Sequence, residues 1–102
     1  MHPRRWNSAA GELTLASVRL LYEGSHWRVS ECGYPPGAVF PGRTKRCTWY
    51  VLQGACVLTT DSEHQLSVGD VVELDAGDYK VRVTGDDELR LIRVWELPQG
   101  MS

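Results

Sequence analysis

The sequence predicts an all-β domain, built as a sandwich or a barrel. Short runs of β-branched and aromatic residues recur along the chain, and turns rich in glycine, proline and aspartate separate them at intervals of about eight to twelve residues. No segment repeats its apolar residues at the 3.6-residue spacing of a long amphipathic helix, so we expect little helix. The two observations together favour many short strands.

The length sets the expected domain organisation. A chain of 102 residues suits one domain, and its 42% apolar and 24% charged content is ordinary for a globular protein. We expect an N-terminal arm over residues 1–11, with Trp6 as its anchor. A single domain should follow over residues 12–98, and a C-terminal tail over residues 99–102 should end the chain.

Charge and cysteine content exclude several classes of protein. The formal net charge of −2 gives no general attraction to nucleic acid or to an anionic membrane, and the basic segment 43–46 is interpreted as a solvated loop beside a pocket. No apolar run could span a membrane, and no apolar stretch follows the basic N-terminus as in a secretory signal. Cys32, Cys47 and Cys56 lack metal-type spacing and indicate free thiols in a reducing compartment, so we expect a cytoplasmic protein.

The first half of the chain should hold two strands and a connecting segment. Residues 13–22 alternate and contain β-branched residues, which predicts a strand, although a helix of about ten residues is the alternative. Residues 27–32 alternate in the same way. Two prolines in residues 33–37 interrupt the ladder, and residues 38–46 should form a loop or a short strand.

The second half should hold six further strands joined by glycine turns. The predicted ranges are 47–52, 55–60, 65–68, 71–74, 79–84 and 89–95. Gly54 and Gly69 lie where tight turns are expected. In the last strand, Leu89, Leu91 and Trp95 share one face, because side chains alternate along a strand.

Two glycine-punctuated segments resemble the paired motifs of the cupin family. In the first segment, Cys47 is separated by six residues from Gly54, where the family has a glutamate and a glycine. In the second segment, Gly69 and Gly77 keep the family spacing, with Asp75 in the place of a proline. The resemblance covers about residues 27–95. It implies a cupin-like double-stranded β-helix, that is, a jelly-roll barrel.

The resemblance also implies that the family's metal site is degenerate. The two histidines of the first motif fall on Pro41 and Arg43, or on Phe40 and Gly42, depending on the register, and the last histidine falls on Lys80. Divalent transition metals need imidazole, thiolate or carboxylate ligands, which these positions do not supply. We therefore expect no metal and no cofactor.

Fixed cations could take the place of the metal. The resemblance sends Cys47 and Trp49 into the barrel, and if Arg43 and Lys80 faced its mouth they would favour a carboxylate or phosphate. Trp49 would add a flat apolar wall. The candidate ligand-binding residues are thus Arg43, Cys47, Trp49, Lys80 and Arg82. In the alternative interpretation, Lys80 and Arg82 alternate with apolar residues because their strand is half-exposed.

The leading hypothesis is a metal-free module that binds a small anionic organic ligand in the barrel, as a sensor or accessory protein. One alternative is a metal-independent isomerase or lyase that uses Lys80 or Cys47, although burial should leave Cys47 slow to react. Another is a structural homodimer with a filled barrel. A homodimer is expected in any case, because residues 13–22 are apolar on both faces and related small cupins commonly pair through N-terminal strands.

Overall fold

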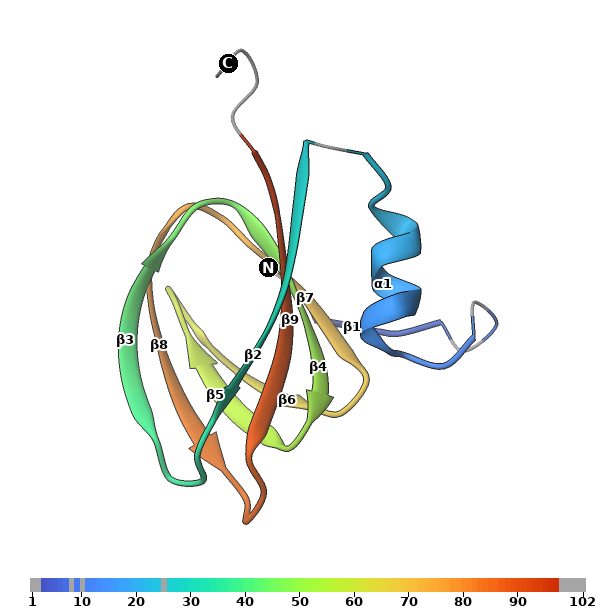
Figure 1. The fold of residues 1–102 in the computed structure, drawn as a ribbon. Coiled ribbons are helices and arrows are strands. Elements are labelled where there is room, and N and C mark those ends of the chain that lie inside the picture. Colours follow the sequence, from blue (N-terminus) through green and yellow to red (C-terminus); the bar gives the residue numbers. More distant parts are fainter. Residues whose placement is uncertain (1–2, 8, 10, 25, 98–102) are drawn as a thin grey trace.

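Two antiparallel sheets pack face to face in the computed structural model of the chain, which describes residues 3–7, 9, 11–24 and 26–97 (Figure 1). The larger sheet has the order β1 (Arg4–Arg5), β7 (Asp70–Leu74), β4 (Cys47–Gln53), β9 (Leu89–Glu96) and β2 (Trp27–Tyr34). The smaller sheet has the order β3 (Val39–Thr44), β8 (Gly77–Thr84), β5 (Ala55–Thr59) and β6 (Glu63–Ser67). This all-β, jelly-roll arrangement confirms the predicted fold class.

The turn between β4 and β5 requires glycine. Gly54 has a φ of 80°, a conformation that side-chain-bearing residues rarely adopt. A Cβ at this position would also lie 2.7 Å from the backbone oxygen of Glu88. The sequence therefore marks this turn correctly, and Gly54 fixes where β4 ends.

The main core lies between the two sheets. On β4, Cys47, Trp49 and Val51 are buried and point toward the smaller sheet, which supplies Leu58 and Val81 in return. The inward direction of Cys47 and Trp49 agrees with the cupin resemblance. The relative exposure of Trp49 is only 1%, so its indole is part of the packed interior.

Residues 13–22 do not form the predicted strand. They contain the helix α1 (Leu15–Leu21), which was the alternative. Thr14 and Ser17 form a capping box: the backbone N–H of Ser17 donates to the Thr14 hydroxyl at 3.1 Å, and the backbone N–H of Thr14 donates to the Ser17 hydroxyl at 2.8 Å. The cap and the burial of Val18 against the larger sheet stabilise the helix. Helix content stays low, as predicted.

The helix covers the outer face of the larger sheet, on the side away from the smaller sheet (Figure 1). Val18 packs there with Tyr50, whose hydroxyl lies 2.6 Å from that of Tyr22. Trp6 packs edge-on against Tyr50, with ring centroids 5.9 Å apart, and donates its indole N–H to the Gly11 carbonyl at 2.9 Å. The larger sheet is thus buried on both faces, and Trp6 anchors the chain before the helix.

Several element bounds differ from the prediction. Residues 38–46 contain a true strand, β3, and Pro41 is tolerated in it because β3 is an edge strand of the smaller sheet. The strand β6 begins two residues earlier than expected, at Glu63. The predicted tail, residues 99–102, lies outside the described residues. Among those that are described, no helix is long and apolar enough to cross a membrane.

Candidate functional site

Arg93 lies on the inner face of β9, between the sheets. Side chains alternate along the strand, so Arg93 shares the face of Leu91 and Trp95, which belong to the main core. Its guanidinium carbon lies 4.8 Å from the ring centroid of Trp49 and 5.7 Å from that of Tyr34. Trp49 is also its cross-strand partner on β4. A cation therefore lies in the interior against two aromatic rings, in cation–π contact.

Aromatic side chains hold this guanidinium in place. Its Nη2 donates to the hydroxyl of Tyr34 at 2.6 Å and to that of Tyr79 at 3.4 Å. The ring of Tyr34 stacks on Phe40 with centroids 4.2 Å apart, and Trp49 meets Tyr79 edge-on at 5.2 Å. We call Arg93, Tyr34, Phe40, Trp49 and Tyr79 the arginine–aromatic cluster.

The cluster carries an uncompensated positive charge. No salt bridge joins Arg93 to a carboxylate in the described part of the chain. Its Nε and the Nε1 of Trp49 are both buried N–H donors without a hydrogen-bond partner in the protein. Burial raises the pKa of Tyr34 to about 12, so this side chain stays a neutral phenol. Unpaired buried donors and charges are costly, so the cluster is destabilising as it stands in the protein alone.

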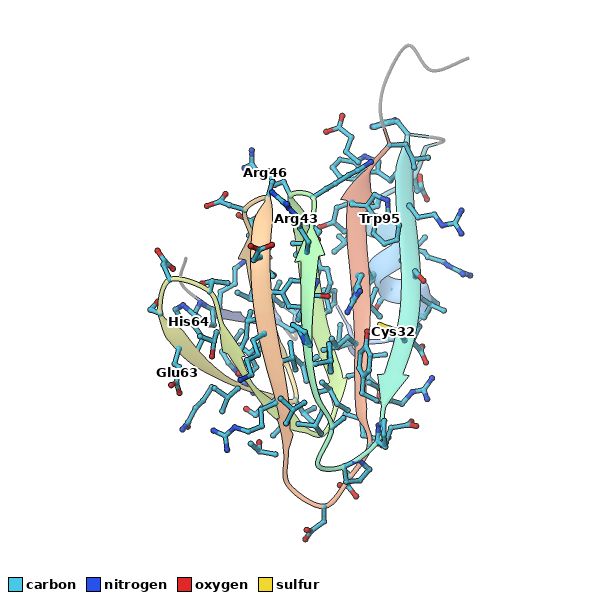
Figure 2. All side chains as sticks on the ribbon, turned by 90° about the vertical axis from the view of Figure 1, so that its left-hand side faces the viewer. Cys32, Arg43, Arg46, Glu63, His64 and Trp95 are labelled. Carbon is cyan, nitrogen blue, oxygen red and sulfur yellow. The ribbon has the colours of Figure 1, made fainter. Side chains whose placement is uncertain are left out.

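A pocket of about 240 Å³ opens at the end of the jelly roll where β3 joins β4. We call this end the mouth and this hollow the inner pocket; its lining residues are Arg43, Thr44, Lys45, Cys47, Arg93 and Trp95. Arg43, Arg46 and Trp95 gather at this end, whereas Glu63 and His64 lie on a separate hairpin (Figure 2). The lining contains three cations and no carboxylate. Arg93 belongs to both the pocket and the cluster.

The structure brings together only part of the site expected from the sequence. Cys47 and Trp49 are buried beside each other on β4, and the hydroxyl of Thr44 lies 3.3 Å from the Cys47 sulfur. Arg43 is at the rim of the inner pocket, where its side chain is 83% exposed and lies 3.7 Å from the carboxylate of Asp78. An ion pair this exposed contributes little to stability. Arg43 is therefore free to turn toward a ligand.

Lys80 and Arg82 are not at the mouth. Both are exposed on the outer face of the smaller sheet, where they border a separate hollow of about 410 Å³. The inward side chains of β8 are Tyr79, Val81 and Val83. Motif spacing assigned the family's last histidine to Lys80, but the inward position is one residue earlier. The interpretation of these two cations as a half-exposed strand is the one that fits.

The residues at the family's metal positions do not fit a metal. On β3, Phe40 packs against the core and Gly42 is its inward neighbour two residues on, so these two positions correspond to the first-motif histidines. A Cβ on Gly42 would lie 2.4 Å from the ring of Tyr79, which fills the space that a ligand side chain would need. No group of three or more His, Cys, Asp or Glu side chains within the described ranges could hold a metal ion. Of these positions, Cys47 carries a thiol and Tyr79 a phenol, and two such groups are too few to hold a metal ion.

Arg93 is a site residue that the sequence patterns above do not predict. The alternation of Leu89, Leu91 and Trp95 places residue 93 on the same face, so a cation in an otherwise apolar row was the available signal. Both cupin motifs end before this strand, and motif spacing therefore gave no reason to consider it.

Comparison with known proteins gives a fold but no sequence family. No family model matches the chain, and no curated protein matches it. Solved structures do match. A cupin superfamily protein from Desulfitobacterium hafniense DCB-2 has a TM-score of 0.62 and 16% identity, over 74% of this chain and 72% of that one.

Two further structures agree. The cupin domain of Cnp3 from Schizosaccharomyces pombe has a TM-score of 0.65 and 17% identity, over 74% of this chain and 56% of that one. A cupin 2 conserved barrel domain protein from Salinispora arenicola CNS-205 has a TM-score of 0.63 and 21% identity, over 76% of this chain and 67% of that one. At such identities the likeness concerns architecture, and the chain folds as a small cupin domain.

Proposed function

We propose that this protein is a metal-free cupin-like module that binds a small organic anion, with a carboxylate as the recognised group, at the mouth of the jelly roll. One observation carries the proposal. The cross-strand neighbours Arg93 and Trp49 each have a buried N–H donor without an acceptor, and one of the two is a cation. Neither Lys80 nor Arg82 takes part.

A carboxylate suits this arrangement for electrostatic and geometric reasons. Guanidinium and carboxylate groups match in shape, and hydrogen bonds between charged partners are about twice as strong as neutral ones. Arg43 and Lys45 add positive charge around the inner pocket. The inner pocket, at about 240 Å³, is smaller than most ligand sites, so it admits a small group rather than a large ligand.

The enzymatic alternative has less support. It requires Lys80 or Cys47 as acid, base or nucleophile, and Lys80 is exposed on the outer face of the smaller sheet. Cys47 is 6% exposed, and no histidine lines the inner pocket to act as its base. The third hypothesis, a filled structural barrel, fits most of the interior, because Trp49 and Tyr79 pack across it. The inner pocket at the mouth is the part of this interior that we propose a ligand enters.

A sensor or accessory role in the cytoplasm and a homodimeric state are further parts of the proposal. The homodimer no longer rests on a strand, since residues 13–22 contain α1. It is supported instead by Leu20 and Leu21, which are 70% and 57% exposed on that helix. Light scattering at micromolar concentration should give twice the chain mass of 11.4 kDa, and a single-chain mass would contradict the homodimer.

The binding proposal is tested by thermal shift and calorimetry with acetate, benzoate and inorganic phosphate. We expect acetate and benzoate to raise the melting temperature, and Arg93→Met to abolish this rise. Arg19→Met is the matched control, because Arg19 is an exposed arginine on α1 that does not line the inner pocket. Carboxylates that leave the wild-type melting temperature unchanged at ~10 mM, or that stabilise Arg93→Met equally, would overturn the proposal.

A further inference from the structure

A second, larger hollow adjoins the inner pocket. This outer pocket has a volume of about 530 Å³ and reaches around the end of the larger sheet to its outer face. The two pockets share Lys45, Cys47 and Trp95 in their linings, so they meet at the mouth. A ligand that enters the inner pocket has room to continue into the outer one.

Charge distinguishes the two pockets. The inner pocket is lined by the cations Arg43, Lys45 and Arg93, without a carboxylate. The outer pocket is lined by two cations, Lys45 and Arg46, and by two carboxylates, Glu73 and Glu96. A second anionic group on the ligand would be repelled by these two carboxylates, whereas an uncharged group would not be. The anionic end of a ligand therefore belongs in the inner pocket and its uncharged end in the outer pocket.

Aromatic walls define what that uncharged end is. Trp27, Trp95 and Tyr22 line the outer pocket, together with the aliphatic Val94. The ring of Trp27 is fixed edge-on by Tyr22, with centroids 5.0 Å apart, so this wall is preformed before a ligand arrives. Flat, rigid aromatic walls favour a ring through edge or stacking contacts.

We propose that the ligand is an arylalkanoate: a monocarboxylic acid with one aromatic ring on a short saturated tether. The carboxylate lies in the inner pocket toward Arg93, the tether passes Trp95, and the ring lies in the outer pocket against Trp27. This inference rests on the proposed carboxylate site and adds the class of compound. A tether is required because Cys47 and Trp95 lie between the two pockets, so a ring attached directly to the carboxylate stays at the inner one.

Calorimetry with a homologous series tests the inference: acetate, benzoate, phenylacetate, 3-phenylpropanoate and 4-phenylbutanoate, with 3-phenylpropanamide as the uncharged analogue. We expect 3-phenylpropanoate or 4-phenylbutanoate to bind about tenfold or more tightly than acetate, because burying a ring adds apolar contact. The amide should lose most of that affinity.

Two variants separate the pockets. Thr48 lines only the outer pocket, so Thr48→Phe should fill it, lower the affinity for 3-phenylpropanoate about tenfold and leave acetate binding unchanged. Thr59→Phe is the matched control, a half-buried threonine on β5 that lines neither pocket. If Thr48→Phe does not fold, Thr48→Leu should give a smaller loss of affinity for 3-phenylpropanoate. Saturation-transfer NMR on the wild type should also show the ligand's ring protons in contact with the protein.

The outcomes distinguish the two proposals. Carboxylates that bind through Arg93 with no gain from a tethered ring would overturn the arylalkanoate inference alone. Binding of every acid that is insensitive to Arg93→Met would overturn the carboxylate site and the inference with it. A ring-dependent gain that survives Thr48→Phe would place the ring elsewhere and also overturn the inference.

Discussion

Two arginines on the same strand have opposite surroundings. Arg90, near the start of β9, donates to the carboxylate of Glu88 at 2.9 Å and also to that of Glu31. The hydrogen bonds to Glu31 and Glu88 raise the pKa of the Arg90 guanidinium above its usual value. Arg93 lies three residues further along β9 toward the mouth. It has aromatic rings around it and no carboxylate partner in the described chain.

This difference separates a charge that is paired within the protein from the charge that we propose binds the ligand. Arg90 lies at the end opposite the mouth, which we call the base, where Gly54 and the segment 85–88 close the jelly roll. There the charge of Arg90 is balanced by Glu31 and Glu88. At the mouth, Arg93 has no carboxylate partner among the described residues, and keeping it among aromatic rings costs stability that a well-packed apolar residue would not. Such a cost is expected at a binding site.

The largest expected effect is at the base. Gly54→Ala should lower the free energy of unfolding by about 3 kcal/mol, because alanine is strained at a φ of 80° and its Cβ would meet a backbone oxygen that cannot move away. Urea denaturation measures the change. A loss below about 1 kcal/mol would mean that the base is less rigid than its packing indicates.

The comparison of the two arginines predicts opposite phenotypes. Arg93→Met should weaken carboxylate binding by about 2–3 kcal/mol and leave the melting temperature unchanged or higher. Arg90→Met should leave binding unchanged and slightly lower the melting temperature. Calorimetry and thermal unfolding of both variants check this. A melting temperature that falls strongly in Arg93→Met would make Arg93 a structural residue instead.

The base should also show a pH dependence. Burial raises the pKa of the Cys56 thiol from 9.0 to about 11. A raised folded-state pKa stabilises the fold fully below about pH 9, and this contribution is lost as the pH rises toward 11. The stability difference between wild type and Cys56→Ala should therefore shrink by about 2 kcal/mol between pH 8 and 11 in urea titrations. Tyrosine titrations cancel in this difference, so a constant difference would show that Cys56 is not responsible.

The smallest expected effect is at the mouth. A Cβ on Gly42 would contact the end of the Tyr79 ring, which can rotate away, so Gly42→Ala should cost only about 1 kcal/mol. Moving Tyr79 shifts its contacts with Trp49 and Arg93, so acetate affinity should change more than stability does. Gly42→Ala/Tyr79→Leu should recover most of the lost stability. A loss as large as that of Gly54→Ala would make the two ends equally rigid.

Local rules in the sequence determined most of the strands and turns. The glycines at positions 54, 69 and 77 have positive φ angles, and the alternation in β4 places Cys47 and Trp49 on one face. These signals are local, since they depend on the sterics of one residue or on the pleat of one strand. The capping pair Thr14 and Ser17 is an equally local signal for the start of a helix. The alternation of residues 13–22 indicated a strand instead, and this local conflict led to the wrong prediction.

Tertiary structure alone decided the content of the site. Alternation assigns Tyr79 and Lys80 to opposite faces of β8, but only the packing of the two sheets decides which face is inside. The same packing turns Arg93 inward. It lies beside Trp49, its partner on the neighbouring strand β4, which is 44 positions earlier in the chain. Whether α1 forms also depends on the apolar face that the larger sheet offers to Val18. These choices depend on long-range contacts, which no local pattern encodes.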